Sequence, residues 1–152
     1  LNVGQIVEDA MKTKPVLAIC VGMQALMNRS EENEGVDCLG LMQGEVRYFG
    51  DDLRNNNGDR LKVPHMGWNQ VKQAQDHPLW KGVPDNSRFY FVHSYYVHTE
   101  LKENVTGVAH YGTEIVAALA DNNIFATQFH PEKSQTAGLT LLRNFLRWDG
   151  QN

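Results

Sequence analysis

The segment PVLAICVGMQ, residues 15–24, constrains the fold more than any other part of the chain. Four apolar residues after Pro15 predict a short buried strand over 15–19, and the residues from Gly22 to about residue 28 predict a helix. Cys20 stands where the strand turns into the helix. Small residues two positions before and after a nucleophile, here Ala18 and Gly22, are typical of an elbow that lifts a side chain clear of a sheet.

A thiol in this position has the surroundings that a nucleophile needs. The N-terminus of a helix favours thiolate over thiol, and the N–H of Val21 would point to where an oxyanion could sit. The competing interpretation is an inert buried cysteine, which is common beside apolar strands. This segment alone supports the two interpretations about equally.

Composition limits the remaining function classes. The chain has 152 residues, enough for one domain with a sizeable core, and is 41% hydrophobic and 21% charged. A net charge of −4 gives no sign of a nucleic-acid-binding surface, and no apolar run reaches the length of a membrane span. Cys20 and Cys38 allow one disulfide, but a reduced, cytoplasmic chain with one functional thiol is the preferred interpretation.

A second segment, FATQFHPEKS (125–134), supplies partners for the thiol. His130 and Glu132 are two residues apart, so in an extended segment their side chains emerge on the same side, and Pro131 favours that geometry. A carboxylate there would accept from one ring nitrogen and leave the other for the sulfur. An exposed surface loop is one alternative. A zinc site with Cys20 is another, but no second spacing of metal ligands supports it, so we expect no metal.

The rest of the chain predicts an α/β sheet with an antiparallel extension. Helical spacing predicts a first helix over 3–13, and a last helix over 137–148 with Leu139, Leu142, Phe145 and Leu146 on one face. Polar residues predict a loop over 50–60. The predicted strands or extended segments are 39–49 with an interruption at Gly44, 61–73, 87–99 with a break at His93-Ser94, 105–111 with 114–120 as a hairpin, and 123–129.

Together, AICVGMQ and QFHPEKS resemble the class I glutamine amidotransferases, a family with a Cys-His-Glu triad in this chain order. The segments RSEENEGVDCLGL, VPHMGWNQV and FYFVHSYYV resemble, within that family, the glutaminase subunits of imidazole glycerol phosphate synthase. The resemblance runs from about residue 3 to 148. It implies a flavodoxin-like sheet with an antiparallel extension, and no cofactor.

The resemblance also implies a role for each matching residue. Cys20 would be the nucleophile, His130 the general base and acid, and Glu132 the residue that orients His130. Glutamine would be the substrate, with its α-ammonium held by Glu32. The other residues that the resemblance places at the substrate are Val21, Gly22, Gln24, His93, Ser94 and Tyr95. Without the resemblance, we would interpret Gln24 as a polar residue of a helix and Glu32 as a solvent-exposed charge.

Ammonia released by such an enzyme must be shielded from water, because protonation would destroy its nucleophilicity. The resemblance implies that the partner is a (β/α)8-barrel cyclase, which uses the ammonia to form imidazole glycerol phosphate and aminoimidazole carboxamide ribotide in histidine biosynthesis. Trp68, Tyr90 and Lys133 match positions expected at that interface. Alternatively, the two aromatic residues belong to the core and Lys133 is merely exposed.

The chain departs from the family pattern at its start. It begins with Leu1 and lacks the first strands and the glycine-rich loop that supplies a second oxyanion donor, so residues 1–152 are expected to form one partial domain. Loss of one such donor costs about 10²–10³ in rate, and a missing neighbour strand exposes an apolar edge. We therefore expect this chain alone to be poorly stable and nearly inactive.

Three alternatives remain open at this level. A catalytically silent binding module on the same fold fits the missing loop but not the intact triad. The glutaminase subunit of another class I amidotransferase, serving anthranilate or pyridoxal phosphate synthesis, fits VPHMGWN and GMQ less well. A cysteine hydrolase on a flavodoxin-like sheet would need neither Gln24 nor Glu32.

Overall fold

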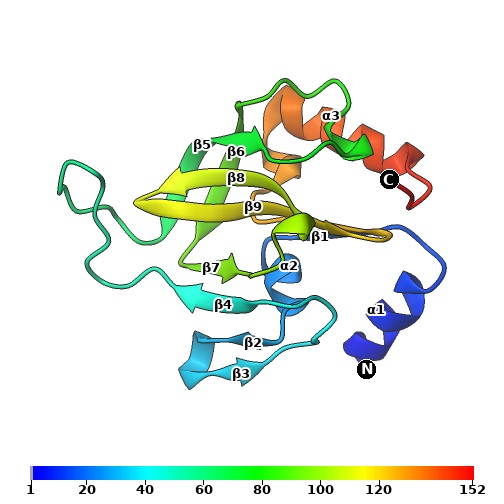
Figure 1. Cartoon of the computed structure of the whole chain (residues 1–152), viewed down its shortest axis with the longest axis horizontal. Coiled ribbons are helices and arrows are strands. Elements are labelled where there is room, and N and C mark those ends of the chain that lie inside the picture. Colours follow the sequence, from blue (N-terminus) through cyan, green and yellow to red (C-terminus); the bar gives the residue numbers. More distant parts are fainter. Residues whose placement is uncertain (1) are drawn as a thin grey trace.

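The computed structural model describes residues 2–152 and contains two β-sheets with three α-helices (Figure 1). The predicted α/β class with an antiparallel extension is confirmed. The larger sheet has the strand order β1 (Val16–Ile19), β10 (Ile124–Thr127), β9 (Thr113–Asp121), β8 (Val105–Tyr111), β5 (His65–Gln73), β6 (Ser87–His93). The smaller sheet has the order β3 (Val36–Asp37), β2 (Arg29–Ser30), β4 (Glu45–Tyr48), β7 (Tyr95–His98).

Strand direction differs between the two ends of the larger sheet. β1 and β10 are parallel, with Ile19 opposite Thr127, whereas all other pairs in this sheet are antiparallel. The sheet also curls back on itself. β6 lies at the far end of the strand order from β1, yet Tyr90 forms an isolated antiparallel bridge with His130, beyond the end of β10. This curl brings three distant segments of the chain to one place.

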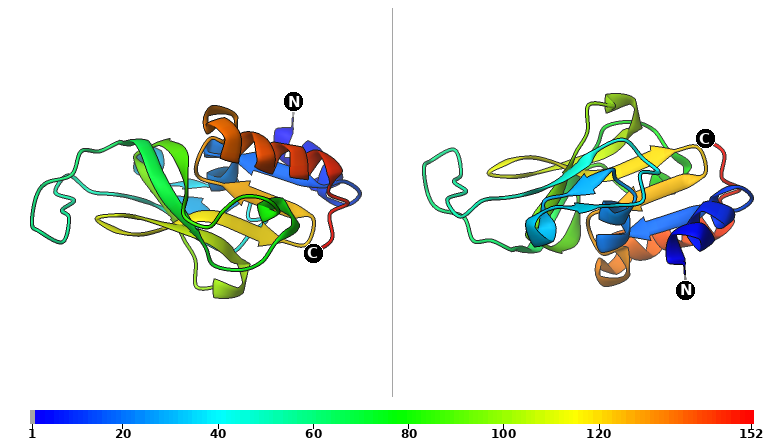
Figure 2. Two further views of the ribbon diagram at one scale, coloured as in Figure 1. Left: turned by 90° about the horizontal axis from the view of Figure 1, so that it is seen from above. Right: turned by 90° about the horizontal axis from the view of Figure 1, so that it is seen from below.

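The helices lie mostly where the hydrophobic spacing predicts them. They are α1 (Val3–Met11), α2 (Val21–Ala25) and α3 (Gln135–Arg147). In both views of Figure 2, α1 and α3 lie on the same side of β1. Among the described residues, no helix is long and apolar enough to cross a bilayer.

Several predicted strands are confirmed. The hairpin over 105–120 is present as β8 and β9, with Gly112 at a φ of +71° in the turn. The predicted break at His93-Ser94 separates β6 from β7, so the chain leaves the larger sheet there and enters the smaller one. Residues 50–60 form the predicted loop, which protrudes at the left of Figure 1.

The predicted strand over 39–49 is wrong for its first part, since only β4 is regular. Residues 39–42 instead donate backbone hydrogen bonds to the end of α2 and the turn after it: Leu39 N to Ala25 O, Gly40 N to Met27 O, and Leu41 N and Met42 N to Leu26 O. The last carbonyls of a helix have no partner within the helix, and this segment supplies one. The apolar run is therefore used to cap a helix rather than to extend a sheet.

The predicted apolar face of the last helix is also wrong in part. The buried residues of α3 are Gly138 and Leu141, and Phe145 packs beside them, whereas Leu139 is 57% and Leu146 is 84% exposed. Among the described residues β1 pairs with β10 alone. On the same side, Val3 and Ile6 of α1 are more than half exposed. The region around β1 thus combines an unpaired strand edge with exposed apolar side chains.

Candidate active site

Cys20 occupies the strand-to-helix elbow that the sequence predicts. It has a φ of +52°, a conformation that non-glycine residues adopt rarely and that clusters at functional sites. Ala18 is buried, and a Cβ placed on Gly22 would lie 3.7 Å from the Cβ of Ala18. A residue larger than alanine at position 22 would press on the strand, so the elbow requires small residues on both sides of the thiol.

The sulfur is half-buried and has two polar neighbours. Sγ lies 3.9 Å from the carbonyl oxygen of Val92, to which the thiol donates, and 3.7 Å from Nε2 of Gln128, which donates to it. Burial raises the pKa of the Cys20 thiol, while the N–H of Val21 and the amide of Gln128 oppose this rise. Burial is the largest of these effects, so the pKa of Cys20 lies above its ordinary value although the thiol stands at the N-terminus of the five-residue helix α2.

His130 and Glu132 form a hydrogen-bonded pair. Nδ1 of His130 donates to Oε1 of Glu132 at 2.6 Å, so Nε2 is the nitrogen left free. His130 is extended, as predicted, but Glu132 lies in a short 3₁₀ turn, Pro131–Lys133, so the side chains meet across a turn rather than along a strand. Ser134 fixes the turn, since its hydroxyl donates to the carbonyl oxygen of His130 at 2.6 Å.

Parallel pairing of β1 with β10 places the thiol and the imidazole at the same end of the sheet. The N–H of Cys20 donates to the carbonyl oxygen of Thr127 at 2.7 Å, and His130 follows three residues later. Side chains that follow the carboxyl ends of neighbouring parallel strands gather at one edge of an α/β sheet. Glu132 and Lys133 are close enough to act in opposite directions on the pKa of Cys20.

Of the residues expected at the substrate, Gln24 and His93 meet at the carbonyl oxygen of a third, Tyr95. Nε2 of Gln24 donates to this oxygen at 3.0 Å and to Oε1 of Gln128 at 3.1 Å. Nδ1 of His93 lies 2.7 Å from the same oxygen. Both amide hydrogens of Gln24 are used within the protein, so only its Oε1 is left to face a ligand. Ser94, between His93 and Tyr95, accepts the N–H of Phe49 through its carbonyl oxygen.

Glu32 lies outside this network. It begins a 3₁₀ turn, Glu32–Glu34, in which its N–H donates to the hydroxyl of Ser30 at 3.1 Å and its side chain is exposed. Among the described residues its carboxylate makes no ion pair. Its negative charge contributes to raising the pKa of Cys38.

The three residues expected at a partner interface lie close to the segment that carries His130 and Glu132. Trp68 and Tyr90 are opposite each other on β5 and β6, with ring centroids 6.0 Å apart, and Trp68 is 41% exposed. The carbonyl oxygen of Tyr90 accepts the N–H of His130 at 2.9 Å. Lys133 is exposed directly after Glu132. The aromatic pair is therefore connected to the segment of His130 and Glu132 through Tyr90, and Trp68 is not a core residue.

Two polar residues at the site were not singled out from the sequence. Gln128 is fully buried beside Cys20, and His65 is 3% exposed beside His93. Both lie in segments that carry the resemblance, QFHPE and VPHMGWN. The signal available for Gln128 was a polar amide within the largely apolar segment FATQF, directly before His130. No such signal existed for His65, because its contact with His93 depends on the pairing of β5 with β6.

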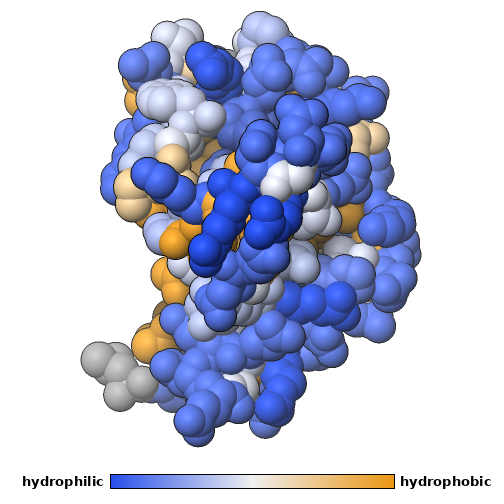
Figure 3. Space-filling view, turned by 90° about the vertical axis from the view of Figure 1, so that its left-hand side faces the viewer, coloured by the Kyte–Doolittle hydropathy of each residue, from blue (hydrophilic) through white to orange (hydrophobic). Residues whose placement is uncertain are grey.

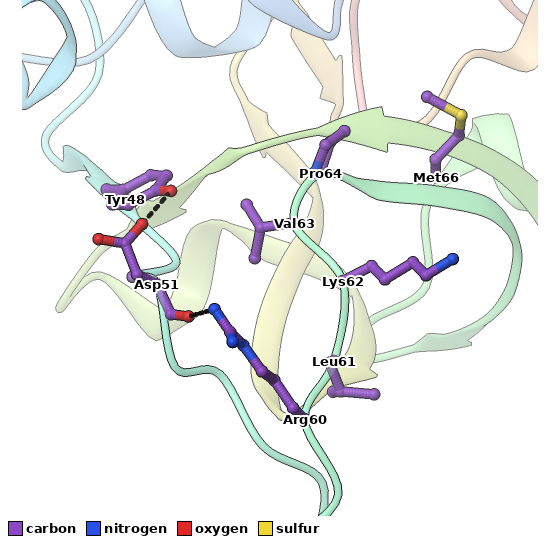
Figure 4. A pocket seen from close by; sticks show the side chains of 9 residues that line it. Tyr48, Asp51, Arg60, Leu61, Lys62, Val63, Pro64 and Met66 are labelled. Atoms are coloured by element: carbon purple, nitrogen blue, oxygen red, sulfur yellow. Dashed lines mark hydrogen bonds between the residues drawn. The ribbon is translucent and has the colours of Figure 1, made fainter.

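A cavity of about 510 Å³ is lined by residues between 48 and 66, and Cys20 is not among them (Figure 4). Tyr48, Asp51, Arg60 and Lys62 are among its lining residues. The hydroxyl of Tyr48 donates to Asp51 at 2.8 Å, and Arg60 donates to the carbonyl oxygen of Asp51 at 2.7 Å. Figure 3 shows this side of the molecule, with a strongly hydrophilic centre where the 50–60 loop protrudes and apolar patches beside it.

Neither of two other interpretations of the cysteines is found in the structure. Cys20 and Cys38 are free thiols rather than a disulfide. Among residues 2–152, no group of three or more His, Cys, Asp or Glu side chains is arranged to hold a metal ion.

Residues 2–148 match the family described as glutamine amidotransferase class-I. The chain is 58% identical over 151 residues to imidazole glycerol phosphate synthase subunit HisH 1 of Pseudomonas aeruginosa, covering 99% of this chain and 70% of that protein. It is 57% identical over 151 residues to subunit HisH of Pseudomonas putida, covering 99% of this chain and 71% of that protein.

Solved structures share the fold at lower identity. A glutamine amidotransferase from Thermotoga maritima aligns with a TM-score of 0.58 at 18% identity, covering 95% of this chain and 51% of that one. A Thermoplasma acidophilum protein described as a component of GMP synthase aligns with a TM-score of 0.66 at 22% identity, covering 95% of this chain and 61% of that one. These matches confirm the predicted fold class.

Proposed function

Because the chain belongs to the class-I glutamine amidotransferase family and, within it, to the HisH subunits of imidazole glycerol phosphate synthase, we propose that it hydrolyses glutamine and delivers the ammonia to a cyclase partner. The observation that carries the proposal is the position of Cys20. Its thiol lies at the strand-to-helix elbow that follows β1, next to the segment in which His130 is hydrogen-bonded to Glu132.

The chemistry follows from these three side chains. Nε2 of His130 accepts the thiol proton, and the sulfur attacks the side-chain amide carbon of glutamine. The carbon–nitrogen bond then breaks as His130 returns the proton to the departing nitrogen, which releases ammonia and leaves a glutamyl thioester. Water, deprotonated by His130, hydrolyses the thioester to glutamate. Glu132 holds the ring so that Nε2, not Nδ1, is the active nitrogen throughout.

A thiol that is protonated at rest suits this sequence of steps. Burial keeps the pKa of Cys20 raised, so the sulfur depends on His130 for activation when substrate is present. We propose that Gln24 Oε1, the backbone around Ser94 and Tyr95, and the Glu32 carboxylate bind glutamine, with Glu32 on the α-ammonium. Glu32 lies away from the network around the thiol, so this role requires the substrate to extend from Cys20 to the 3₁₀ turn.

The proposed partner is a (β/α)8-barrel cyclase that receives the ammonia. The proposed contact surface consists of Trp68, Tyr90 and Lys133. It is supported by the exposure of Trp68 and by the backbone hydrogen bond from His130 to Tyr90. The reaction there would form imidazole glycerol phosphate and aminoimidazole carboxamide ribotide. The matched relatives carry the name of that synthase.

We further propose that residues 1–152 are part of a domain completed by preceding strands. Two observations support this. The chain covers 70% of the Pseudomonas aeruginosa relative, and β1 has one edge that pairs with no strand among the described residues. A segment that pairs with β1 would cover the apolar edge and would bring a second oxyanion donor to the thiol.

The test is glutamine-dependent ammonia release, measured with and without the cyclase and its nucleotide ligand. The chain would be assayed with the N-terminal segment of its Pseudomonas aeruginosa relative restored. We expect activity that rises with the cyclase, is lost in Cys20→Ser, and is retained in Cys38→Ser as the matched control. A folded, cyclase-bound protein without glutaminase activity would contradict the proposal and favour a silent binding module.

A further inference from the structure

A continuous path of hydrogen bonds connects the buried pair His65–His93 with the sulfur of Cys20. It runs from the two imidazoles to the carbonyl oxygen of Tyr95, then through the amides of Gln24 and Gln128 to Sγ. His65, His93 and Gln128 are all at least nine-tenths buried. Nothing in the proposed reaction uses these three side chains, so their burial needs another explanation.

The direction of each bond can be worked out from the Tyr95 carbonyl, because this oxygen can only accept. Nε2 of Gln24 must therefore be the atom that faces it, which fixes the orientation of that amide. The second hydrogen of the same nitrogen donates to Gln128, so the atom of Gln128 facing Gln24 is Oε1. It follows that the atom of Gln128 facing Cys20 is its NH₂ group, a donor.

The same carbonyl fixes the tautomers of the two histidines. Nδ1 of His93 lies 2.7 Å from the oxygen and must carry a hydrogen, so Nε2 of His93 is an acceptor while the ring is neutral. Nδ1 of His65, 2.9 Å from that Nε2, must then be the donor. Nε2 of His65 is left to accept from the amide of Asn69 at 3.4 Å. Every donor and acceptor along the path has one consistent assignment.

Charge on either ring would break this pattern. Burial, with the mutual influence of the two rings, lowers the pKa of His65 to about 3, and burial lowers that of His93 to about 4. Both rings are therefore neutral at any pH at which such an enzyme works. The pair acts as a fixed pair of donors rather than as a proton switch.

We infer that Gln128 is a further catalytic residue, which donates a hydrogen bond to the Cys20 sulfur as it becomes a thiolate, and that Gln24, His93 and His65 are the positioning residues that fix its amide orientation. The inference rests on the proposed role of Cys20 as nucleophile and deepens it. If the Gln128 amide were flipped, its oxygen would face the Cys20 thiolate and oppose its formation. The orientation of this amide therefore decides whether Gln128 lowers or raises the pKa of Cys20.

Other groups act on the same sulfur, and the experiment must hold them constant. From the turn after β10, Glu132 raises and Lys133 lowers the pKa of Cys20, and His130 is the proposed base. From α2, the N–H of Val21 lowers it. Substitutions at Gln128 and His65 leave all of these groups in place.

The first experiment measures the rate of Cys20 alkylation by iodoacetamide from pH 6 to 10, in a Cys38→Ser background so that one thiol reacts. Gln128→Met removes the donor at similar volume, whereas Gln128→Glu retains the acceptor for Gln24 and places a carboxylate oxygen against the sulfur. We expect a rise of about one pKa unit in Gln128→Met, which slows alkylation about tenfold near neutral pH, and a larger rise in Gln128→Glu. Equal apparent pKa values in all three proteins would overturn the inference.

The second experiment tests the far end of the path. Asparagine places its amide nitrogen near the position of Nδ1, so His65→Asn retains the donor to His93, and His65→Leu removes it. We expect alkylation two- to threefold slower in His65→Leu, with recovery in His65→Asn, at matched melting temperatures. If both variants slow the reaction equally, His65 has only a packing role and its place in the path is wrong.

A third measurement needs no substitution. With ¹⁵N-labelled imidazole rings, His65 and His93 should both appear as neutral Nδ1–H tautomers from pH 5 to 9, and an Nε2–H tautomer at either ring would contradict the assigned directions. None of these readouts requires turnover of glutamine. A protein that shows the alkylation order but lacks glutaminase activity would contradict the proposed function, and with it the catalytic role of Gln128, but not the effect of Gln128 on the pKa of Cys20. A protein with glutaminase activity but equal alkylation rates would keep the proposed function and overturn the inference.

Discussion

At the scale of single residues, the site is organised by a backbone atom. The carbonyl oxygen of Tyr95 accepts from both Gln24 and His93, and through them it determines which way two amides and two imidazoles point. A backbone oxygen is a suitable fixed point, because it has no rotamer and cannot donate. The side chains that depend on it are therefore held in one arrangement before a substrate arrives.

Buried histidines also make the stability of the protein depend on pH. Burial lowers the pKa of His77 to about 4, below its ordinary value of 6.5, so the unfolded chain binds a proton that the native protein does not bind between these values. The stability that neutral His77 contributes is complete above pH 6.5 and is lost as the pH falls toward 4. His77 lies outside the triad, between the rings of Phe125 and Trp148.

We predict that His77→Asn reduces the loss of unfolding free energy between pH 7 and pH 5 by about 1–2 kcal/mol. Nδ1 of His77 accepts the N–H of Leu79 at 3.1 Å, and asparagine retains an acceptor in that position while removing the titrating ring. Urea unfolding at pH 7, 6 and 5 measures the effect. Parallel pH profiles for the two proteins would show that His77 does not titrate as its burial implies.

At the scale of elements, α3 holds the His130–Glu132 turn in place through a close backbone approach. A Cβ on Gly138 would clash with the carbonyl oxygen of Pro131 and would lie 2.8 Å from the Cβ of Ser134. Pro131 lies between the two triad residues. The helix therefore packs directly on the turn that orients the imidazole, and only glycine allows this contact.

We predict that Gly138→Ala impairs the site, although alanine favours a helix interior by about 1 kcal/mol over glycine. Overpacking against backbone costs about 1–3 kcal/mol and must displace the turn or the helix. The expected result is a fall in glutaminase activity larger than any fall in melting temperature. Thr136→Ala, at an exposed position of the same helix, is the matched control and should retain both properties. An active, more stable Gly138→Ala protein would contradict the close packing.

At the scale of the whole molecule, exposed apolar side chains lie near β1, a strand that has one unpaired edge among the described residues. β1 carries the thiol at its end and pairs with β10 alone among the described strands. On the side of β1 where α1 and α3 lie, Ile6 is 56%, Leu139 is 57% and Leu146 is 84% exposed. An open strand edge next to exposed apolar side chains favours association between chains.

We predict that residues 1–152 alone associate at micromolar concentration and unfold at low urea concentration. Restoring the N-terminal segment of the Pseudomonas aeruginosa relative should give a monomer with a cooperative transition at a higher midpoint, because the segment would pair with β1 and cover the apolar side chains. Sedimentation velocity and urea unfolding of both proteins measure this. A monodisperse 152-residue chain with a cooperative transition and cyclase-stimulated glutaminase activity would show that no further strands are needed.

Features that depend on neighbours along the chain could be predicted from the sequence. The elbow at Cys20 follows from an apolar run that ends against small residues. The hairpin follows from two strand-forming segments on either side of Gly112, and the pairing of His130 with Glu132 from their spacing around proline. The resemblance of AICVGMQ and QFHPEKS to a triad family was sufficient to identify the family. Each of these signals lies within about ten residues, where backbone geometry alone relates side chains.

The tertiary structure decided what depends on contacts between distant segments. Strand order and curl brought Tyr90 to His130, and the pairing of β5 with β6 set His65 against His93. Residues 39–42 satisfied the carbonyls of a helix end instead of joining a sheet, and Leu139 faced outward although its spacing is helical. The orientation of Gln128 depends on one backbone oxygen far away in sequence. Local propensity has no information about such partners, because hydrogen-bond satisfaction and packing are settled only when the whole chain is in place.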